Sequence, residues 1–325
     1  MTVRWGIAGP GDIAKSFARG LGQIEGAELV AVGSRSRERA QAFATTYGTA
    51  VAYGSYEELA ADPNVEIVYV ATPQSRHERD TLLFLEAGKH VLCEKPFALS
   101  APQARRMVEA ARRRGLFLME AMWTRFLPPY QKLAEILAAG TLGELRLVEG
   151  EFGMRVPVVP THRLFDLAQG GGALLDLGVY PVQLCSMVLG TPTRVAAAGA
   201  VGETGVDEQV VAVLQHEHAG LGVAKAAIRT YMSCTGRVIG TDGRVDIPAF
   251  VHCPDHLTLV TAAGKAERID TPWEGEGIRF QAIEVHRCLA AGLRESPTMP
   301  LDESVAIMTT LDEIRRQVGV VFPDE

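Results

Sequence analysis

The chain has 325 residues, 47% hydrophobic and 22% charged, which suits about two globular domains with well-filled cores. A net charge of -7 and a pI near 5.7 exclude the broad basic surface that nucleic acids or anionic membranes require. Five scattered cysteines predict reduced thiols. We see no secretory leader and no apolar run of bilayer-spanning length. We therefore expect a soluble, cytoplasmic protein without disulfides and without nucleic-acid or membrane partners.

Short strand candidates alternate with amphipathic helical stretches up to about residue 120. The strand candidates are Trp5–Ala8, Leu29–Val32, Ile67–Ala71, His90–Cys93 and Phe117–Met119. This alternation predicts a parallel, doubly wound sheet. Capping boxes predict helix starts at Ser55, Ser75 and Ser100.

The pattern changes after Met122, and hairpin-like turns such as Thr241–Arg244 predict a mostly antiparallel sheet. Its strand candidates are Arg146–Phe152, Arg194–Ala200, Gln209–Leu214, Leu221–Ala227, Val245–Ile247, Leu257–Val260 and Glu267–Ile269, with helices near Pro128–Ala139, Gly172–Leu189 and Glu303–Val318. The sequence thus predicts two α/β domains, one over residues 1–122 and one over residues 123–325.

The first motif is a glycine-rich turn between a strand candidate and a helix, Gly9-Pro-Gly11-Asp-Ile-Ala14. Gly9 permits the tight turn, Gly11 lets the backbone approach a pyrophosphate, and Ala14 allows close helix packing. The helix start at Asp12 and Ile13 attracts the anion. An ordinary glycine-rich turn is the alternative, but the position at the head of the alternating region favours dinucleotide binding.

The end of the second strand candidate has no acidic residue, although an NAD site carries Asp or Glu there for the ribose 2′-hydroxyl. The chain instead reads Gly33-Ser34-Arg35-Ser-Arg37-Glu-Arg39. Ser34 can donate a hydrogen bond to a 2′-phosphate, while Arg35 and Arg39 can bracket its charge. The sequence therefore predicts NADP rather than NAD, with an ordinary basic helix start as the alternative.

Two further strand ends face the crevice where ligands bind in open α/β sheets. One is followed by Cys93-Glu94-Lys95-Pro96, the other by Thr72-Pro73. We expect contacts with the nicotinamide end of the cofactor from Thr72, Pro73, His77, Glu94 and Lys95. A surface turn stiffened by proline is the alternative.

The last motif is Gly170-Gly-Gly-Ala-Leu-Leu-Asp176-Leu-Gly-Val-Tyr180. If the glycines open a helix, Asp176 and Tyr180 stand at i and i+4 and share one face. An ammonium group such as that of Lys95 would lower the pKa of the phenol and prepare Tyr180 for proton transfer. The alternative is a packed aromatic ring at Tyr180 and a helix-surface acid at Asp176.

Two histidine pairs have spacings that resemble those of metal ligands, His216-Glu-His218 and His252-Cys-Pro-Asp-His256. The first lies at an expected hairpin end and the second spans a proline turn, so neither presents its rings on one helical face. We expect no metal site.

Together these motifs make the chain similar, over essentially its whole length, to the family of glucose-fructose oxidoreductase, inositol dehydrogenase and rhizopine-catabolism proteins (Gfo/Idh/MocA). The motifs are Gly9-Pro-Gly11, Glu94-Lys95-Pro96, Glu120-Ala-Met-Trp123-Thr-Arg125-Phe and Gly170 to Tyr180. The chain resembles most the dimeric dihydrodiol dehydrogenase branch, which shares Trp123-Thr-Arg125-Phe, a stretch like His162 to Asp166, and tyrosine at position 180. Most of the family has histidine there.

The resemblance implies a Rossmann domain followed by an α/β domain whose large, mostly antiparallel sheet has an open face that often forms the subunit contact. It therefore implies a homo-oligomer, either a dimer or a tetramer. Lys95 would orient substrate and cofactor, Tyr180 would be the acid/base, and Asp176 would be its partner. The resemblance also implies that Trp123 and Arg125 contact cofactor or substrate and that His162 and Arg163 border the pocket.

We therefore predict an NADP-dependent oxidoreductase that moves a hydride between nicotinamide and a hydroxyl or carbonyl carbon of a sugar, keto-sugar or cyclic diol. A polar pocket favours such substrates because it rejects ligands that leave its groups unpaired. The expected substrate-binding residues are Lys95, Arg125, His162, Asp176 and Tyr180. The rival interpretations are a non-catalytic NADP-binding sensor or regulatory protein and an NAD-linked polyol dehydrogenase.

Overall fold

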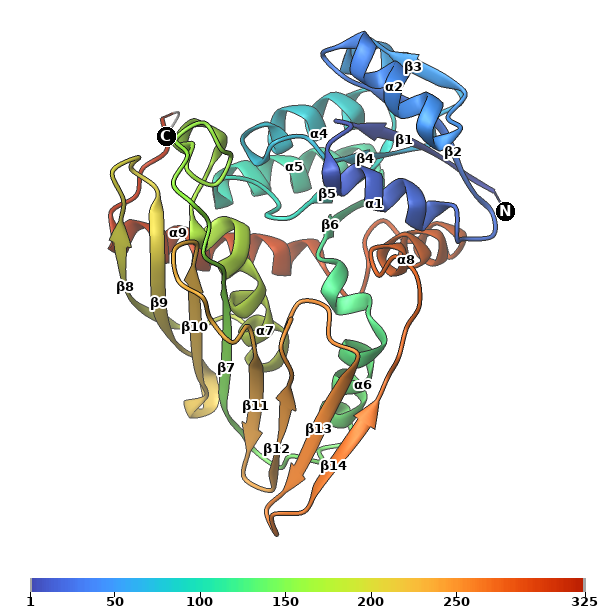
Figure 1. Ribbon diagram of the computed structural model, residues 1–325. Coiled ribbons are helices and arrows are strands. Elements are labelled where there is room, and N and C mark those ends of the chain that lie inside the picture. The colour runs from blue at the N-terminus through green and yellow to red at the C-terminus, as the bar shows by residue number, and fades with distance from the viewer. Residues whose placement is uncertain (1, 324–325) are drawn as a thin grey trace. The chain divides into compact units, whose positions relative to one another are not determined.

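The computed structural model describes residues 2–323 and shows two compact units (Figure 1). The first unit comprises the chain up to Phe126 together with Glu274–Val305, and the second comprises Leu127–Trp273 together with the chain from Ala306. The domain boundary predicted at residue 122 assigned the segment 274–305 to the second domain. That segment packs into the first unit, where Trp5 Nε1 donates a hydrogen bond to Nε2 of His286 at 3.0 Å.

The first unit is built on a six-stranded parallel sheet in the order β3-β2-β1-β4-β5-β6. The strands are β1 (Val3–Ala8), β2 (Ala27–Gly33), β3 (Val51–Tyr53), β4 (Ile67–Val70), β5 (His90–Glu94) and β6 (Leu118–Ala121). The strand order reverses between β1 and β4, which is the point where open α/β sheets bind ligands. The predicted parallel, doubly wound sheet is confirmed.

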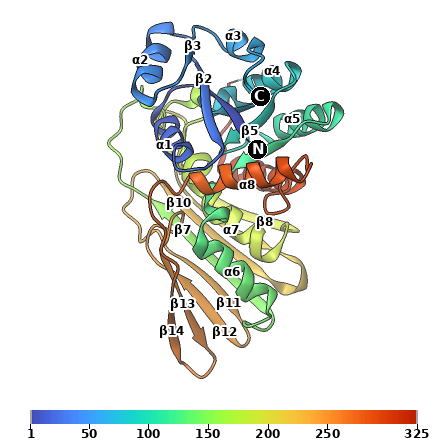
Figure 2. The same cartoon turned by 90° about the vertical axis from the view of Figure 1, so that its right-hand side faces the viewer.

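Helices cover both faces of this sheet, with α4 and α5 packed together on one face and α1 and α8 on the other (Figures 1 and 2). The helices are α1 (Asp12–Leu21), α2 (Arg37–Tyr47), α3 (Tyr56–Ala61), α4 (His77–Glu86), α5 (Ala101–Arg114) and α8 (Arg279–Ala290). Two short 3-10 helices join them, η1 (Gln74–Arg76) and η2 (Trp123–Phe126).

The three predicted capping boxes have different outcomes. Ser55 caps α3, since its side chain accepts the N–H of Glu58 at 3.1 Å. Ser100 precedes α5 but makes no side-chain cap bond. The prediction at Ser75 was wrong because that residue lies inside η1 and α4 begins only at His77.

The second unit carries an eight-stranded sheet in the order β14-β13-β12-β11-β7-β10-β9-β8, in which only β7 and β10 pair in parallel among the described strands. The strands are β7 (Leu145–Gly153), β8 (Arg194–Val201), β9 (Asp207–Gln215), β10 (Leu221–Ala227), β11 (Gly236–Gly240), β12 (Gly243–Ile247), β13 (His256–Thr261) and β14 (Ala266–Asp270). The predicted mostly antiparallel sheet and the hairpin at Thr241–Arg244 are confirmed, while β11 was not predicted.

Helices α6 (Pro128–Ala138) and α7 (Val179–Leu189) cover one face of this sheet (Figure 2). A π-helix, η4 (Leu174–Gly178), leads directly into α7. Short 3-10 turns lie at η3 (Leu167–Gln169) and η5 (Glu217–Ala219), and α9 (Leu301–Val318) follows α8 in the chain. Near its end, Gln317 accepts the N–H of Ala197 on β8 at 2.7 Å.

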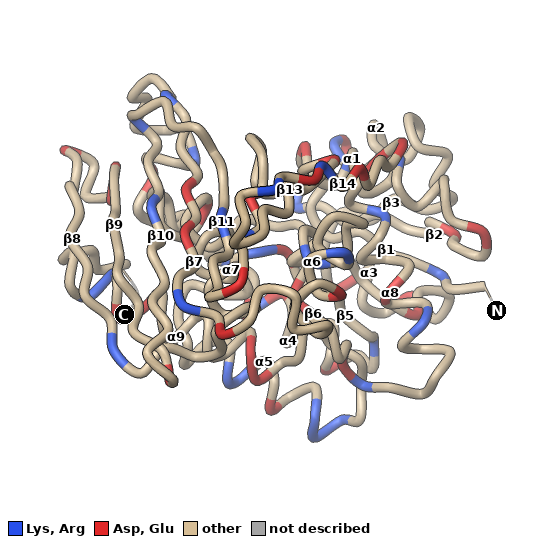
Figure 3. Tube along the Cα trace, turned by 90° about the horizontal axis from the view of Figure 1, so that it is seen from below, with Lys and Arg blue, Asp and Glu red and all other residues tan. Residues whose placement is uncertain are grey.

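One apolar stretch, Leu167–Leu189, has the length and composition of a membrane span, so the expectation that no run approaches that length was wrong. Most of this stretch is buried inside the fold, as is typical of a core helix. Acidic and basic residues are interspersed along both units (Figure 3). All five cysteines are free, as predicted.

Candidate active site

The glycine-rich turn after β1 is shaped by close backbone packing at one glycine and by open space at the other. Gly9 has φ +91°, and a Cβ there would lie 2.9 Å from the carbonyl oxygen of Ala71. Gly11 is the N-cap of α1, and no atom apart from its chain neighbours lies within 4 Å of a Cβ built on it. Asp12 and Ile13 then begin α1 with exposed side chains. A pyrophosphate fits this open helix N-terminus.

The end of β2 presents hydroxyl and guanidinium groups. Ser34 is buried, and its Oγ accepts the N–H of Ser36 at 3.2 Å. Ser36 in turn caps α2 by accepting the N–H of Arg39 at 3.3 Å. The side chains of Arg35 and Arg39 are exposed. This end of the strand therefore offers positive charge at the surface.

A third arginine, to which sequence reasoning gave no role, belongs to the same group of cations. The Arg76 guanidinium lies 5.6 Å from the ring centre of Tyr56 and bonds Asp80 at 2.7 and 3.1 Å. Burial raises the pKa of Tyr56, Asp80 adds to that rise, and Arg76, Arg35 and Arg39 each oppose it. All three arginines thus act on one hydroxyl. The segment Ser75–Glu78 gave a misleading signal because it resembles a capping box.

His77 connects the ends of β4 and β5. Its Nδ1 lies 2.8 Å from the carbonyl oxygen of Pro96, and its Nε2 lies 3.0 Å from that of Thr72. The ring is buried, and burial lowers its pKa. Both ring nitrogens therefore face backbone carbonyls, which suits a link between two loops better than a contact with cofactor.

The turn that carries Lys95 is fixed by buried carboxyl groups. Glu94 accepts the hydroxyl of Tyr69 and, at 3.1 Å, the backbone N–H of Lys95. On the neighbouring strand β6, Glu120 accepts the N–H of Phe97 at 3.1 Å, and burial raises the pKa of Glu120 to about 7. Glu94 is therefore turned inward, while Lys95 is partly exposed. Sequence reasoning gave Glu120 no role, because its contact with Phe97, in the turn after β5, is visible only in the structure.

Trp123 is partly exposed, whereas Arg125 lies inside the first unit. The Arg125 guanidinium donates to both carboxylate oxygens of Glu303, at 2.6 and 2.8 Å, and to the carbonyl oxygen of Thr298 at 3.2 Å. Arg125 is only 3% exposed. This bidentate pair connects η2 to α9. The guanidinium that the sequence predicted to bind a ligand is therefore engaged in contacts within the protein.

In the second unit, the glycine triplet joins the loop before it to the helix after it. Gly171 and Gly172 donate their N–H groups to the carbonyl oxygens of Asp166 and Leu164, at 2.9 and 3.0 Å. Gly170 has φ +81° and ends η3. These bonds fix the loop that carries His162 to Asp166 against the start of η4.

The predicted helix over Gly172–Leu189 begins as the π-helix η4, in which Asp176 lies. The Asp176 carboxylate accepts two hydrogen bonds from Arg163, at 2.8 and 3.2 Å. Single π-turns inside helices occur frequently at functional sites. Helical spacing places the expected Asp176 and Tyr180 on one continuous segment but could not reveal this change of pitch.

Tyr180 lies in the first turn of α7 and is 6% exposed. Its ring centre lies 5.5 Å from that of Phe152 on β7 and 5.4 Å from that of His252. Sequence reasoning missed both ring partners because they are distant in the chain and only the sheet brings them near. His162 is exposed, and its Nδ1 accepts the N–H of Leu164 at 3.3 Å.

The histidine pairs that resemble metal ligands are separated by their surroundings. His252 stacks on Phe152 at 4.6 Å, and His256 bonds Asp255 at 2.6 Å. His216 is buried. Within residues 2–323, no group of three or more His, Cys, Asp or Glu side chains is placed to hold a metal ion.

Comparison with known proteins extends over the whole chain. Residues 3–122 match the family described as "Oxidoreductase family, NAD-binding Rossmann fold", and residues 130–246 match the "GFO/IDH/MocA C-terminal domain". The chain is 43% identical over 337 residues to trans-1,2-dihydrobenzene-1,2-diol dehydrogenase of Macaca fascicularis and 42% identical over 339 residues to that of Homo sapiens. Both alignments cover 100% of this chain and 99% of the relative.

Solved structures agree with these relatives. A 3-ketoreductase from Actinomadura kijaniata, in complex with NADP and TDP-benzene, has a TM-score of 0.86 and 26% identity over 98% of both chains. A levoglucosan dehydrogenase, solved with NADH and levoglucosan, has a TM-score of 0.90 at 18% identity over 98% of both chains and shows the shared fold alone. The chain therefore belongs to the GFO/IDH/MocA family of oxidoreductases, as the motifs predicted, and residues 3–122 form its NAD-binding Rossmann domain.

Proposed function

We propose that this oxidoreductase uses NADP and transfers a hydride to or from a carbinol or carbonyl carbon of a cyclic diol, sugar or keto-sugar. The observation that carries the proposal is that one chain holds both Lys95, on a turn fixed by buried carboxyl groups, and Tyr180, in the first turn of α7. Both residues are present in a chain that is 42–43% identical, over its full length, to dihydrodiol dehydrogenases.

The residues around the glycine turn fit NADP. Gly9, Gly11, Asp12 and Ile13 would hold the pyrophosphate at the start of α1. At the end of β2, the residues that would hold the 2′-phosphate are Ser34, Arg35 and Arg39, with Arg76 as a third cation oriented by Asp80. The 3-ketoreductase of similar fold was solved with NADP.

Proton transfer is the task of Tyr180. The bound nicotinamide would supply or accept the hydride. During reduction Tyr180 donates its phenolic proton to the substrate oxygen, and during oxidation the phenolate accepts it. The Lys95 ammonium would stabilise negative charge on that oxygen. Solved forms of the 3-ketoreductase include a lysine-to-alanine and a tyrosine-to-phenylalanine variant.

Other predicted site residues divide into contact and support. Thr72, Pro73 and Trp123 would border the nicotinamide. Glu94, His77 and Arg125, whose polar atoms are bonded inside the first unit, would act by holding the segments near it. Asp176, fixed by Arg163, would orient the substrate together with Tyr180, and exposed His162 would border the pocket.

The test compares Tyr180→Phe and Lys95→Met with the control Tyr130→Phe. Tyr130 is another buried tyrosine of the second unit, and its hydroxyl donates to the carbonyl oxygen of Val251 at 2.7 Å. Tyr180→Phe should lower kcat by about 10²- to 10⁴-fold while the Kd for NADPH changes little. Lys95→Met should act similarly and also raise KM for the substrate. Normal turnover by Tyr180→Phe on a good substrate would show that the acid/base assignment is wrong.

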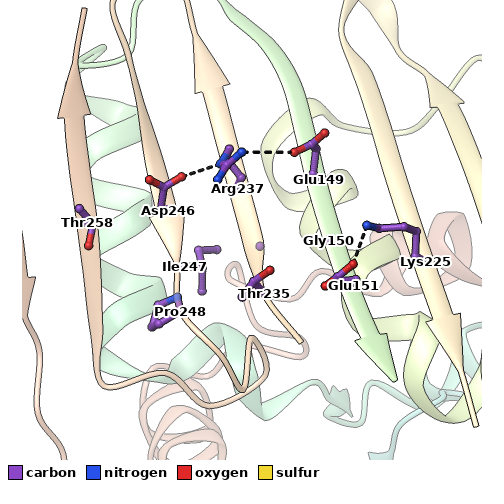
Figure 4. A pocket seen from close by; sticks show the side chains of 11 residues that line it. Glu149, Gly150, Glu151, Lys225, Thr235, Arg237, Asp246, Ile247, Pro248 and Thr258 are labelled. Carbon is purple, nitrogen blue, oxygen red and sulfur yellow. Dashed lines mark hydrogen bonds and ion pairs between the residues drawn. The ribbon is translucent and has the colours of Figure 1, made fainter. Parts of the chain in front are cut away.

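The proposed partners are the small-molecule substrate and further copies of the chain, as a dimer or tetramer through the uncovered face of the eight-stranded sheet. Val211, Val213 and Leu221 are exposed on this face. Beside them lies a hollow whose charged lining residues are Glu149, Glu151, Lys225, Arg237 and Asp246 (Figure 4). Lys225 pairs with Glu151 at 2.5 Å and Arg237 with Asp246 at 2.6 Å. A second copy could cover the apolar part, while these pairs form a polar rim.

We also propose that the protein works in the cytoplasm. Cys93, Cys185 and Cys288 are buried free thiols, and burial raises the pKa of Cys185 to about 12. Unpaired buried thiols are typical of proteins from reducing compartments.

A further inference from the structure

A buried carboxyl group from a distant strand holds the start of the helix that carries Asp176 and Tyr180. Asp207 begins β9 and is 3% exposed. Its Oδ2 accepts the backbone N–H of Leu174, the first residue of η4, at 2.6 Å. The first N–H groups of a helix have no partner within the helix, so a side-chain oxygen there fixes the first turn.

The glycine before this turn makes the contact possible. Gly172 has φ +128°, and a Cβ built on it would lie 2.2 Å from Oδ1 of Asp207. No side chain can therefore occupy position 172 unless the carboxyl group moves away. The glycine triplet therefore has two structural roles. It leaves room for Asp207 to reach the helix start, and Gly171 and Gly172 bond the preceding loop.

The surroundings of Asp207 favour a permanent cap. Burial raises the pKa of its carboxyl group to about 7, whereas the N–H groups of Leu174 and Ala173 and the charge of Arg315 oppose that rise. The oxygen atoms accept hydrogen bonds in either protonation state, and a negative charge at a helix N-terminus is also favourable. The cap does not depend on one charge state.

We propose that Asp207 is a positioning residue for the reaction, because its contact with Leu174 sets where the first turn of the helix places Asp176 and Tyr180. This inference rests on the proposed role of Tyr180 in proton transfer. Loss of the cap lets the first turn shift or fray. A shift of that turn carries Asp176 away from Arg163 and moves the Tyr180 ring relative to Phe152 and His252. Misplacement of a reacting group by about 1 Å can cost on the order of 100-fold in rate.

The experiment uses Asp207→Ala, which removes the acceptor, and Asp207→Asn, which keeps one acceptor oxygen. Asp207→Ala should lower kcat by roughly 10- to 100-fold, with the Kd and stoichiometry of NADPH unchanged, and Asp207→Asn should recover most of that loss. Hydrogen exchange of the peptide that contains Leu174 should be faster in Asp207→Ala than in the parent. An unchanged kcat in a folded, NADPH-binding Asp207→Ala variant overturns the proposal, whatever its exchange rate.

Gly172→Ala disturbs the contact between Asp207 and Leu174 by changing the glycine beside it. This variant tests the proposed role of Asp207 if Asp207→Ala does not fold. It should lower kcat and speed the same exchange, because the added methyl group displaces the carboxyl group. Gly190→Ala is the matched control, since Gly190 ends α7 with φ +79° and no atom within 4 Å of a Cβ. Wild-type turnover by Gly172→Ala overturns the proposal. Wild-type turnover by Tyr180→Phe would instead refute the proposed function, while the exchange rates still report the cap.

Discussion

Arginine side chains at the end of β2 are the residues on which the choice between NADP and NAD depends. Arg35 and Arg39 are exposed, and Arg76 is held by Asp80. The sequence identified the first two because they replace the acidic residue of an NAD site. It could not identify Arg76, whose place beside Tyr56 follows from the packing of η1 and α3.

At this scale we predict that Arg35→Asp weakens NADPH binding by about tenfold to 100-fold, because charge-assisted hydrogen bonds worth about 1.5–3 kcal/mol are lost. NADH binding should change little. Arg37→Asp makes the same charge change at another exposed arginine, in the first turn of α2, and it should weaken NADPH binding much less. Titration of each variant with NADPH and with NADH measures the two Kd values. Equal Kd values for NADPH and NADH in the unmutated protein would contradict the NADP assignment.

At the scale of elements, periodicity predicted most strands and helices because their apolar residues face one core. The strand β3 was missed because it is only three residues long, and the five-residue β11 was missed as well. Helix α8 was missed too, and with it the return of the chain to the first unit. Capping signals were least reliable: the three boxes look alike in sequence, yet only Ser55 makes the expected side-chain bond.

The caps give a direct comparison. Ser55→Ala removes the acceptor for the N–H of Glu58 and should destabilise α3 by about 1 kcal/mol. Ser100→Ala removes a hydroxyl that makes no cap bond at α5, so it should reduce the stability of the protein by less than Ser55→Ala does. Thermal unfolding of both variants at one protein concentration measures the difference, and a larger loss of Tm in Ser100→Ala would show that the cap assignment is wrong.

At the scale of the whole molecule, the motifs predicted the family and both sheets. They could not predict which side chains support the site. Phe152 and His252 reach Tyr180 only through the sheet, and Asp207 reaches Leu174 across 33 positions of the chain. Such contacts depend on strand register, which a single sequence does not specify.

The uncovered sheet face predicts an assembly. Val213→Glu places a charge among the exposed apolar side chains of β9 and should shift the protein toward the monomer, because burying an unpaired charge at an interface is costly. Ile283→Glu, at an exposed position of α8 in the first unit, is the control. Sedimentation velocity over a range of concentrations measures the effect. A parent protein that is monomeric at every concentration would rule out the proposed assembly.

The central claim is NADP-linked hydride transfer on small cyclic polyols, and NADPH absorbance tests it most directly. Trans-dihydrodiols, aldoses and keto-sugars would be assayed in both directions beside short-chain alcohols, aldehydes and hydroxy acids, each with NADP(H) and NAD(H). We predict turnover on members of the cyclic set, faster with NADP(H), and its loss in Tyr180→Phe. Turnover confined to the acyclic compounds would contradict the claim, and tight NADPH binding without turnover on any compound would favour a sensor instead.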